Sequence, residues 1–95
     1  MKEIEYSTSF KKDYKSLTQE QKNSFIDAVA ILKEGGTLPF VPYRTHKLTG
    51  NFKDCSEAHI ESDLLLIWHD VDKETIALLR IGSHSKLFGK KKGAR

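Results

Sequence analysis

The spacing of apolar residues in the first third of the chain is helical. Apolar side chains recur three or four positions apart in residues 7–17, and the same spacing returns in 18–36. In the second segment Phe25, Val29 and Leu32 form one stripe, the pattern of a helix that buries a single face. The two segments therefore predict a pair of helices joined as a hairpin.

The expected second helix has sequence signals at both of its ends. Thr18 and Gln21 form a T-x-x-Q pattern, in which each side chain can bond the other residue's backbone amide at a helix start. Gly35 and Gly36 follow the last apolar position, and glycine adopts the left-handed conformation that ends many helices. We expect the helix to begin after Thr18 and to end at these glycines.

Strand-like patterns lie on both sides of the hairpin. Residues 2–6 (KEIEY) alternate charged and apolar side chains, which predicts a short first strand. Residues 52–60, 64–70 and 75–82 predict three further strands that form an antiparallel meander. The middle one, LLLIWHD, is apolar on both faces, so we place it at the centre of the sheet.

These elements predict the fold class. Residues 37–50 (TLPFVPYRTHKLTG) read as a loop, because Pro39 and Pro42 oppose regular structure. The expected fold is α+β, with an N-terminal strand, a two-helix hairpin and then an antiparallel meander, the helices packed on one sheet. We expect one domain over residues 1–89 and a basic, flexible tail over 90–95.

Composition narrows the class of protein. Hydrophobic residues make up 38% and charged residues 31% of the 95 positions, which is typical of a soluble domain. No stretch approaches the roughly 20 apolar residues of a membrane span, and the first ten residues do not resemble an export signal. Cys55 is the single cysteine, so an internal disulfide and a zinc-thiolate site are both excluded. We expect a cytoplasmic protein with no membrane partner.

The net charge of +3 arises from the last six residues and not from residues 1–89. The last six residues supply four of the 16 Lys and Arg, which leaves 12 basic against 13 acidic residues in 1–89. Basic residues cluster only between Glu34 and Asp54, where Arg44, Lys47 and Lys53 occur with no acidic residue among them. An anion site therefore has to come from local clustering, and Lys47 and Lys53 are candidate substrate-binding residues.

An arginine interrupts the apolar pattern of the last expected strand. Alternation places Arg80 in one row with Ile76 and Leu78, where an unpaired charge would be costly. Two interpretations remain open: an ion pair with Glu57 or Asp63 on a neighbouring strand, or a site for a substrate phosphate.

Histidines and a carboxylate lie near the same end of the expected meander. Antiparallel pairing can bring His59, Asp63, Arg80 and His84 to one edge of the sheet, with His46 closing over it from the loop. Imidazoles, a carboxylate and a guanidinium can together cleave RNA without a metal, because they move the two protons and neutralise the phosphate.

Each of these residues also has a plainer interpretation. A lone histidine is more often structural or exposed, and Ser83 or Ser85 can simply cap a final helical turn. Phe88 can stack on a base or can close the core near the C-terminus. A zinc site made from the four histidines matches no standard ligand spacing, and we expect neither a metal nor another cofactor.

Three motifs in order resemble a known family. H-x-L-x-G begins at His46, H-I-x-x-D begins at His59, and R-x-G-S-H-x-x-L-F runs from Arg80 to Phe88. Together they resemble the YafQ-type toxins of the RelE/ParE superfamily, the toxin halves of bacterial type II toxin–antitoxin pairs. The resemblance implies a RelE-like fold and a ribosome-dependent endoribonuclease that cleaves messenger RNA and is silenced by an acidic, dimeric, DNA-binding antitoxin.

The resemblance also implies roles for individual residues. His84 and Asp63 are the candidates for proton transfer, His46 and His59 support or share that work, Arg80 stabilises the phosphate, and Phe88 contacts the substrate. Four positions depart from the usual pattern. Phe52 stands where tryptophan is usual and Ser56 where arginine is common, and Ser62 stands for a usual proline and Leu64 for a frequent tryptophan. These departures bear on substrate positioning and on the strength of cleavage.

The sequence also bears on three other functions. A toxin directed at gyrase is disfavoured because that branch of the superfamily generally lacks the histidines. A module that only binds RNA or antitoxin stays open, since a displacement near 1 Å can silence catalysis. A metal-dependent nuclease is disfavoured because clustered carboxylates are missing from the sequence.

Overall fold

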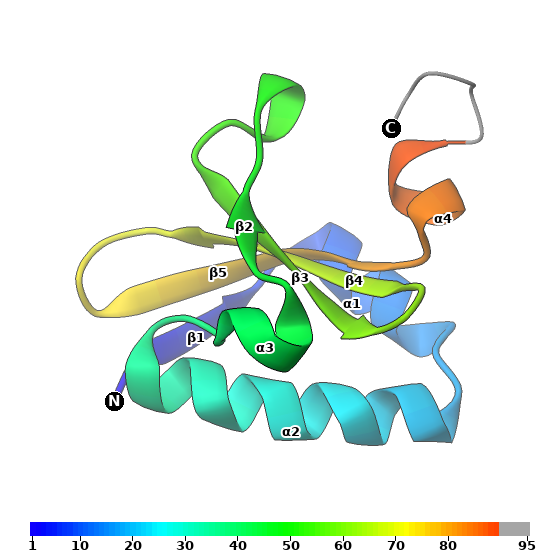
Figure 1. Cartoon of the computed structure of the whole chain (residues 1–95), viewed down its shortest axis with the longest axis horizontal. Helices are drawn as coiled ribbons and strands as arrows, with labels where there is room; N and C mark the ends of the chain where they lie inside the picture. The colour runs from blue at the N-terminus through cyan, green and yellow to red at the C-terminus, as the bar shows by residue number, and fades with distance from the viewer. Residues whose placement is uncertain (90–95) are drawn as a thin grey trace.

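A five-stranded sheet forms the centre of the structure, a computed structural model that describes residues 1–89 (Figure 1). The strands lie in the order β1-β5-β4-β3-β2, with β1 parallel to β5 and the other neighbours antiparallel. Their bounds are β1 Glu3–Tyr6, β2 His46–Lys47, β3 Cys55–Glu61, β4 Leu64–Asp70 and β5 Thr75–Gly82. The α+β class and the antiparallel meander of β3, β4 and β5 match the expectation, whereas β2 was not predicted. The tail expected at 90–95 lies outside the described residues.

The long helices cover one face of this sheet. Figure 1 shows α2 on one side, while α4 and the segment after β2 stand on the other. None of the helices in residues 1–89 has the length and apolar character needed to cross a membrane. The helices are α1 Thr8–Lys15, α2 Gln19–Gly35, α3 Phe40–Tyr43 and α4 His84–Phe88, with a 3₁₀ turn η1 at Gly50–Phe52.

The signals read at the ends of the second helix are confirmed. The Thr18 hydroxyl accepts from the Gln21 amide, and the Gln21 side chain accepts from the Thr18 amide, which completes the capping box. Gly36 ends α2 in the left-handed conformation at φ 82°. Local sequence chemistry thus fixes both ends of the helix that covers the core.

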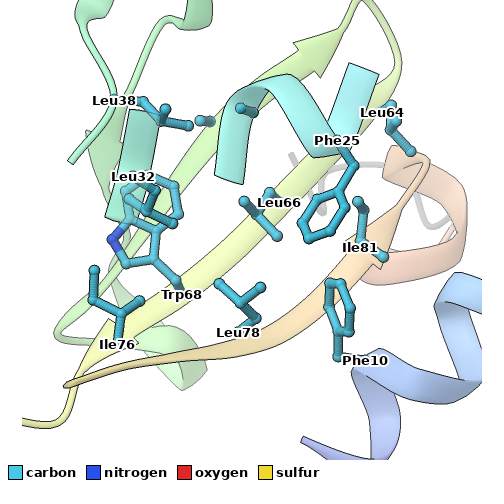
Figure 2. Close-up of a cluster of buried hydrophobic side chains, with 12 residues drawn as sticks. Phe10, Phe25, Leu32, Leu38, Leu64, Leu66, Trp68, Ile76, Leu78 and Ile81 are labelled. Atoms are coloured by element: carbon cyan, nitrogen blue, oxygen red, sulfur yellow. The ribbon is translucent and has the colours of Figure 1, made fainter. Parts of the chain in front are cut away.

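The main core lies between this helix and the sheet. Figure 2 shows Phe25 of α2, Leu66 and Trp68 of β4 and Leu78 of β5 pointing toward one another. Each is 5% exposed or less, and burying one such side chain stabilises the fold by roughly 1.5–3 kcal/mol.

A smaller cluster covers the opposite face. It contains Cys55, Leu65, Ile67 and Leu87. Because β4 supplies Leu66 and Trp68 to one cluster and Leu65 and Ile67 to the other, the prediction that LLLIWHD forms the central strand is confirmed.

The prediction that residues 37–50 form only a loop was wrong. Phe40–Tyr43 makes one helical turn, ended by Arg44 in the left-handed conformation at φ 54°. His46–Lys47 then pairs with β3 as the edge strand β2, so that His46 lies opposite Glu57. Pro39 precedes the first residue of α3 and Pro42 lies within it, so the prolines did not prevent this short helical turn.

The predicted row of Ile76, Leu78 and Arg80 was also wrong. Leu78 lies opposite Trp68 and Arg80 opposite Ile67, so Leu79 is an extra residue in the ladder. Such a bulge reverses the alternation that follows it. Ile81 therefore takes the place in the main core that simple alternation gives to Arg80.

Candidate active site

Three imidazole rings lie in a row on the face of the sheet that α2 leaves open. His46 comes from β2, His59 from β3 and His84 from the first position of α4. The ring centroids of His46 and His59 are 6.5 Å apart, and those of His59 and His84 are 5.8 Å apart. The structure thus brings together side chains that are up to 38 positions apart in the sequence.

The outer imidazole of this row, His84, is held by Asp63. The His84 ring Nδ1 lies 2.9 Å from Asp63 Oδ1, and the same oxygen accepts the His84 backbone N–H at 3.0 Å. The hydrogen bonds from the His84 backbone and ring lower the pKa of Asp63, so its carboxylate is ionised near neutral pH. A carboxylate at Nδ1 requires a proton there and leaves Nε2 as the nitrogen that is not engaged by Asp63.

Both nitrogens of the ring at the other end, His46, are engaged. Nδ1 lies 2.9 Å from the carbonyl oxygen of Arg44, which only accepts, so this nitrogen carries a proton. Nε2 lies 3.1 Å from Glu57 Oε1, and Glu57 is 1% exposed. One further proton joins Nε2 to this carboxyl group, so neither nitrogen has a free lone pair for a substrate proton.

The central ring, His59, is half-buried between the other two. Its Nδ1 is buried and has no hydrogen-bond partner among the described residues, so Nε2 is the candidate nitrogen for contact with a substrate. Burial lowers the pKa of His59, the Glu57 carboxyl opposes this, and the charges of Arg44, His84 and His46 lower it further. The neutral ring, which can accept a proton, is therefore favoured.

Arg44 supplies positive charge beside His59 and was not among the residues expected in the site. With His59 and Ser62 it lines an open hollow of roughly 330 Å³ between α3 and the end of β3. Arg44 is exposed and holds a left-handed backbone at φ 54°, which is uncommon for a residue with a side chain. The conformation positions its carbonyl for His46.

Arg80 turns away from this row and pairs with Asp13 of α1. Arg80 Nε and Nη2 donate to the two carboxylate oxygens at 2.7 and 3.0 Å. The open interpretation of an ion pair is therefore correct, but the partner is neither Glu57 nor Asp63. The pairing raises the pKa of Arg80, whose side chain remains 28% exposed.

Asp13 is the buried centre of this second cluster. Its Oδ2 also accepts the Ile81 backbone N–H at 3.0 Å. Burial alone would raise the pKa of Asp13, but the bonds from Arg80 and Ile81 and the charges of Arg80 and Lys86 outweigh burial and lower it. Asp13 thus fastens α1 to β5 as a carboxylate.

The predicted substrate-binding residues separate into two groups. The Phe88 ring lies 6.4 Å from that of His84 and 5.7 Å edge-on from Phe52, and it packs on the smaller core cluster. Both interpretations of Phe88 thus fit its position. Lys47 and Lys53 are exposed, and no hydrogen bond or ion pair within residues 1–89 joins either of them to the histidines.

Sequence reasoning missed three residues of these clusters: Glu57, Arg44 and Asp13. Glu57 carried a signal, because it is an acidic residue on the same face of the expected strand as His59. Arg44 belongs to the basic stretch but precedes the first motif. Asp13 reads as an ordinary helix acid, since its partner lies 67 positions away.

Residues 1–89 contain no group of three or more His, Cys, Asp or Glu side chains placed to hold a metal ion. Their carboxylates are spread: Glu57 binds His46, Asp63 binds His84, and Asp13 lies with Arg80. The three imidazoles do not converge on one point, so these residues do not fit a resident metal.

Comparison with known proteins gives consistent matches along the chain. The family model described as bacterial toxin of type II toxin-antitoxin system, YafQ, matches residues 2–89. The mRNA interferase toxin YafQ of Escherichia coli strain K12 is 34% identical over 90 residues, covering 93% of this chain and 97% of that protein.

Solved structures agree in fold. The E. coli DinJ–YafQ toxin–antitoxin complex contains a chain with a TM-score of 0.77 and 33% identity, covering 93% of this chain and 98% of that one. A metal-bound toxin from Helicobacter pylori has a TM-score of 0.68 and 35% identity, covering 93% and 100%.

Proposed function

The chain belongs to the YafQ family of toxins from bacterial type II toxin–antitoxin systems, and on this premise we propose that it is an endoribonuclease that cleaves messenger RNA. The observation that carries the proposal is the row of three imidazoles with a carboxylate on each outer ring. In the proposed reaction the 2′-hydroxyl of a nucleotide attacks the adjacent phosphate and the 5′-oxygen of the next nucleotide leaves. One proton has to be removed and one supplied.

His59 is the proposed general base. The neutral ring is favoured by its burial and by the surrounding positive charges. Because Nδ1 is buried, Nε2 is the nitrogen proposed to take the 2′-hydroxyl proton as the oxygen–phosphorus bond forms.

His84 is the proposed general acid, and Asp63 is its positioning residue. Asp63 fixes the proton of Nδ1 and stabilises positive charge on the ring when Nε2 also carries a proton. That second proton passes to the 5′-oxygen as the phosphorus–oxygen bond breaks. The 5.8 Å between the two ring centroids leaves room for the base and the acid to act on opposite sides of one phosphate.

Positive charge for the reacting phosphate comes from His46 and Arg44 in this proposal. With Glu57 ionised, His46 is an imidazolium fixed by two acceptors, and it stabilises charge without moving a proton. Arg44 adds a guanidinium beside His59. Arg80 is held by Asp13 away from the row and is not assigned to the reacting phosphate, whereas Phe88 offers a ring beside His84 for a base.

The proposed partners follow from the family. The substrate is messenger RNA on the ribosome, which places the protein in the cytoplasm, and an antitoxin blocks the toxin. The E. coli relative in complex with DinJ supports a protein antitoxin. We propose that the cognate antitoxin is acidic and dimeric and carries a DNA-binding end. The reaction itself uses side chains of this chain only, with no metal.

Primer extension on messenger RNA after brief induction of the protein tests this function. We expect new 5′ ends within translated codons within minutes, and loss of methionine incorporation before loss of thymidine incorporation. Intact messages together with an early stop in thymidine incorporation would refute the proposal and indicate a target in replication. Co-expression of the neighbouring antitoxin gene is expected to abolish the new ends.

A further inference from the structure

A second basic hollow lies beside α1, away from the imidazole row. It is open, with a volume of roughly 400 Å³, and Arg80 contributes to its wall. Lys12 and the hydroxyl residues Ser9 and Ser16 line it from α1 and the residue after it, and Lys86 lines it from α4. Three separate elements thus direct polar and basic side chains into one hollow.

Both carboxylate oxygens of Asp13, the one acidic residue that lines this hollow, are engaged by neighbouring groups. Asp13 is 3% exposed, and its Oδ2 accepts from Arg80 and from the Ile81 backbone. Its Oδ1 accepts from Arg80 and lies 3.7 Å from the Lys86 ammonium. Asp13 therefore orients two cations without presenting a free carboxylate to a ligand. Three cations and one carboxylate leave a net charge of two positive at the hollow.

Hydrogen-bond donors remain for a ligand. Arg80 uses two of the five N–H donors of its guanidinium on Asp13, and its side chain is 28% exposed. The side chain of Lys86 is 40% exposed, and Lys12 is exposed. A fixed guanidinium fork flanked by ammonium groups and hydroxyls suits an oxyanion with several oxygens, of which phosphate is the closest chemical match.

We propose that this hollow binds a backbone phosphate of RNA other than the one that is cleaved. The inference deepens the proposed function, on which it rests. His84 and Lys86 lie two positions apart on α4, His84 contacting Asp63 and Lys86 contacting Asp13. The helix therefore places a proton donor toward the cleft and an ammonium toward the hollow. The shared ligand chemistry is a phosphodiester, from the message or from ribosomal RNA.

Lys12→Ala tests the site, and Lys15→Ala is its matched control. Both lysines are exposed on α1, but Lys15 lines a different, mainly apolar hollow with Tyr14 and Phe25. Two probes distinguish the sources of the phosphate. One is a short 2′-O-methyl RNA, which cannot be cleaved because its 2′-hydroxyl is blocked, and the other is the ribosome without a message.

We expect Lys12→Ala to bind at least one probe severalfold more weakly than Lys15→Ala does. The loss of one phosphate contact should also reduce the slope of log affinity against log salt by about 0.7 for single-stranded RNA. A loss toward the 2′-O-methyl RNA identifies the message as the source, and a loss toward the empty ribosome identifies ribosomal RNA.

Equal affinities and equal salt slopes for the two variants toward both probes would overturn the proposal. A Lys12 effect confined to binding of the antitoxin would overturn it as well, because the ligand would then be a protein carboxylate. Message cleavage by the unaltered protein is measured separately. If cleavage is absent while the Lys12-dependent binding persists, the phosphate site stands and the endoribonuclease proposal fails.

Discussion

Two carboxylates, Glu57 and Asp63, determine which ring nitrogens of the imidazole row are available. Glu57 and a backbone carbonyl occupy both nitrogens of His46, whereas Asp63 occupies only Nδ1 of His84. Among residues 1–89, no ion pair joins a carboxylate to the half-buried ring of His59. The three histidines therefore differ in which ring nitrogen is available to a substrate.

Loss of His84 should reduce cleavage strongly. A positioned proton donor contributes typically 10²–10⁴-fold in rate, and we expect a loss in that range for His84→Ala. His69→Ala is the matched control, because this half-buried histidine lies outside the row, with its Nδ1 3.4 Å from the backbone carbonyl oxygen of Asp54. Single-turnover cleavage on ribosomes measures both variants, and equal rates for them would remove His84 from the mechanism.

Replacement of Glu57 should act through His46. Glu57→Gln keeps the size of the side chain but cannot accept a proton from the imidazolium. We expect ¹⁵N spectra to show the loss of the proton on His46 Nε2, and cleavage to fall by about tenfold or more. Glu57→Asp should restore part of the activity. An unchanged His46 spectrum together with full cleavage would contradict the positioning role.

The pH dependence of the site should follow His59. Its pKa is lowered below the ordinary 6.5, so the neutral base persists as the pH falls, and the acid limb of the rate profile should lie below that value. Arg44→Gln removes one of the charges that lower this pKa, so the limb should move toward higher pH. NMR titration of the His59 ring measures the shift. A midpoint above 6.5 in the unaltered protein would contradict the assignment.

At the scale of elements, Asp13 joins α1 to the C-terminal end of β5. Asp13→Asn should destabilise the fold at neutral pH by about 2 kcal/mol, less than a fully buried ion pair would lose, since water screens the part of Arg80 that is exposed. The altered side chain remains isosteric, so the loss reports the charge and its hydrogen bonds.

The same substitution should change the response to acid. The folded state lowers the pKa of Asp13 below the ordinary 3.8. Its stabilisation is therefore complete above that value and is lost as the pH falls through the lower, folded pKa. Denaturant titrations should show the difference between Asp13→Asn and the unaltered protein shrinking below pH 3.8. A constant difference down to pH 2 would refute this linkage.

The sequence predicted the elements whose signals are local. The capping pair Thr18 and Gln21 and the terminal Gly36 act within a few positions of themselves, so their effects could be read directly. The bulge at Leu79 could not be predicted in this way, because it is fixed by pairing with β4 and by the burial of Ile81 rather than by Leu79 itself.

The candidate site was predictable in part for the same reason. His59, Asp63 and His84 converge because a tight turn and two strand pairings, β3 with β4 and β4 with β5, connect them. The partnership of Arg80 with Asp13 spans the chain and depends on where α1 packs, which no local pattern encodes. The residue types thus indicated proton transfer by histidines and a carboxylate. The partner of Arg80 could be identified only from the structure.

At the scale of the whole molecule, the main core and the imidazole row lie on opposite faces of the sheet. α2 covers one face and builds the main core, and the imidazole row lies with β2 and α4 on the other (Figure 1). The smaller cluster under α4 contains Leu87 and packs against Phe88. The position of the His84 side chain therefore depends on the packing of α4 as well as on the contact with Asp63. We therefore expect RNA to approach the face opposite α2.

Cleavage of a programmed message on purified ribosomes, followed by primer extension, tests the central claim most directly. The purified unaltered protein is compared with His84→Ala and His69→Ala, and each variant is checked for folding. A further sample of the unaltered protein is freed of metal by a chelator and then assayed on intact ribosomes. We expect new 5′ ends within codons from the unaltered, metal-free and His69→Ala proteins, and few or none from His84→Ala. Cleavage that requires added metal, or that His84→Ala performs at full rate, would contradict the account.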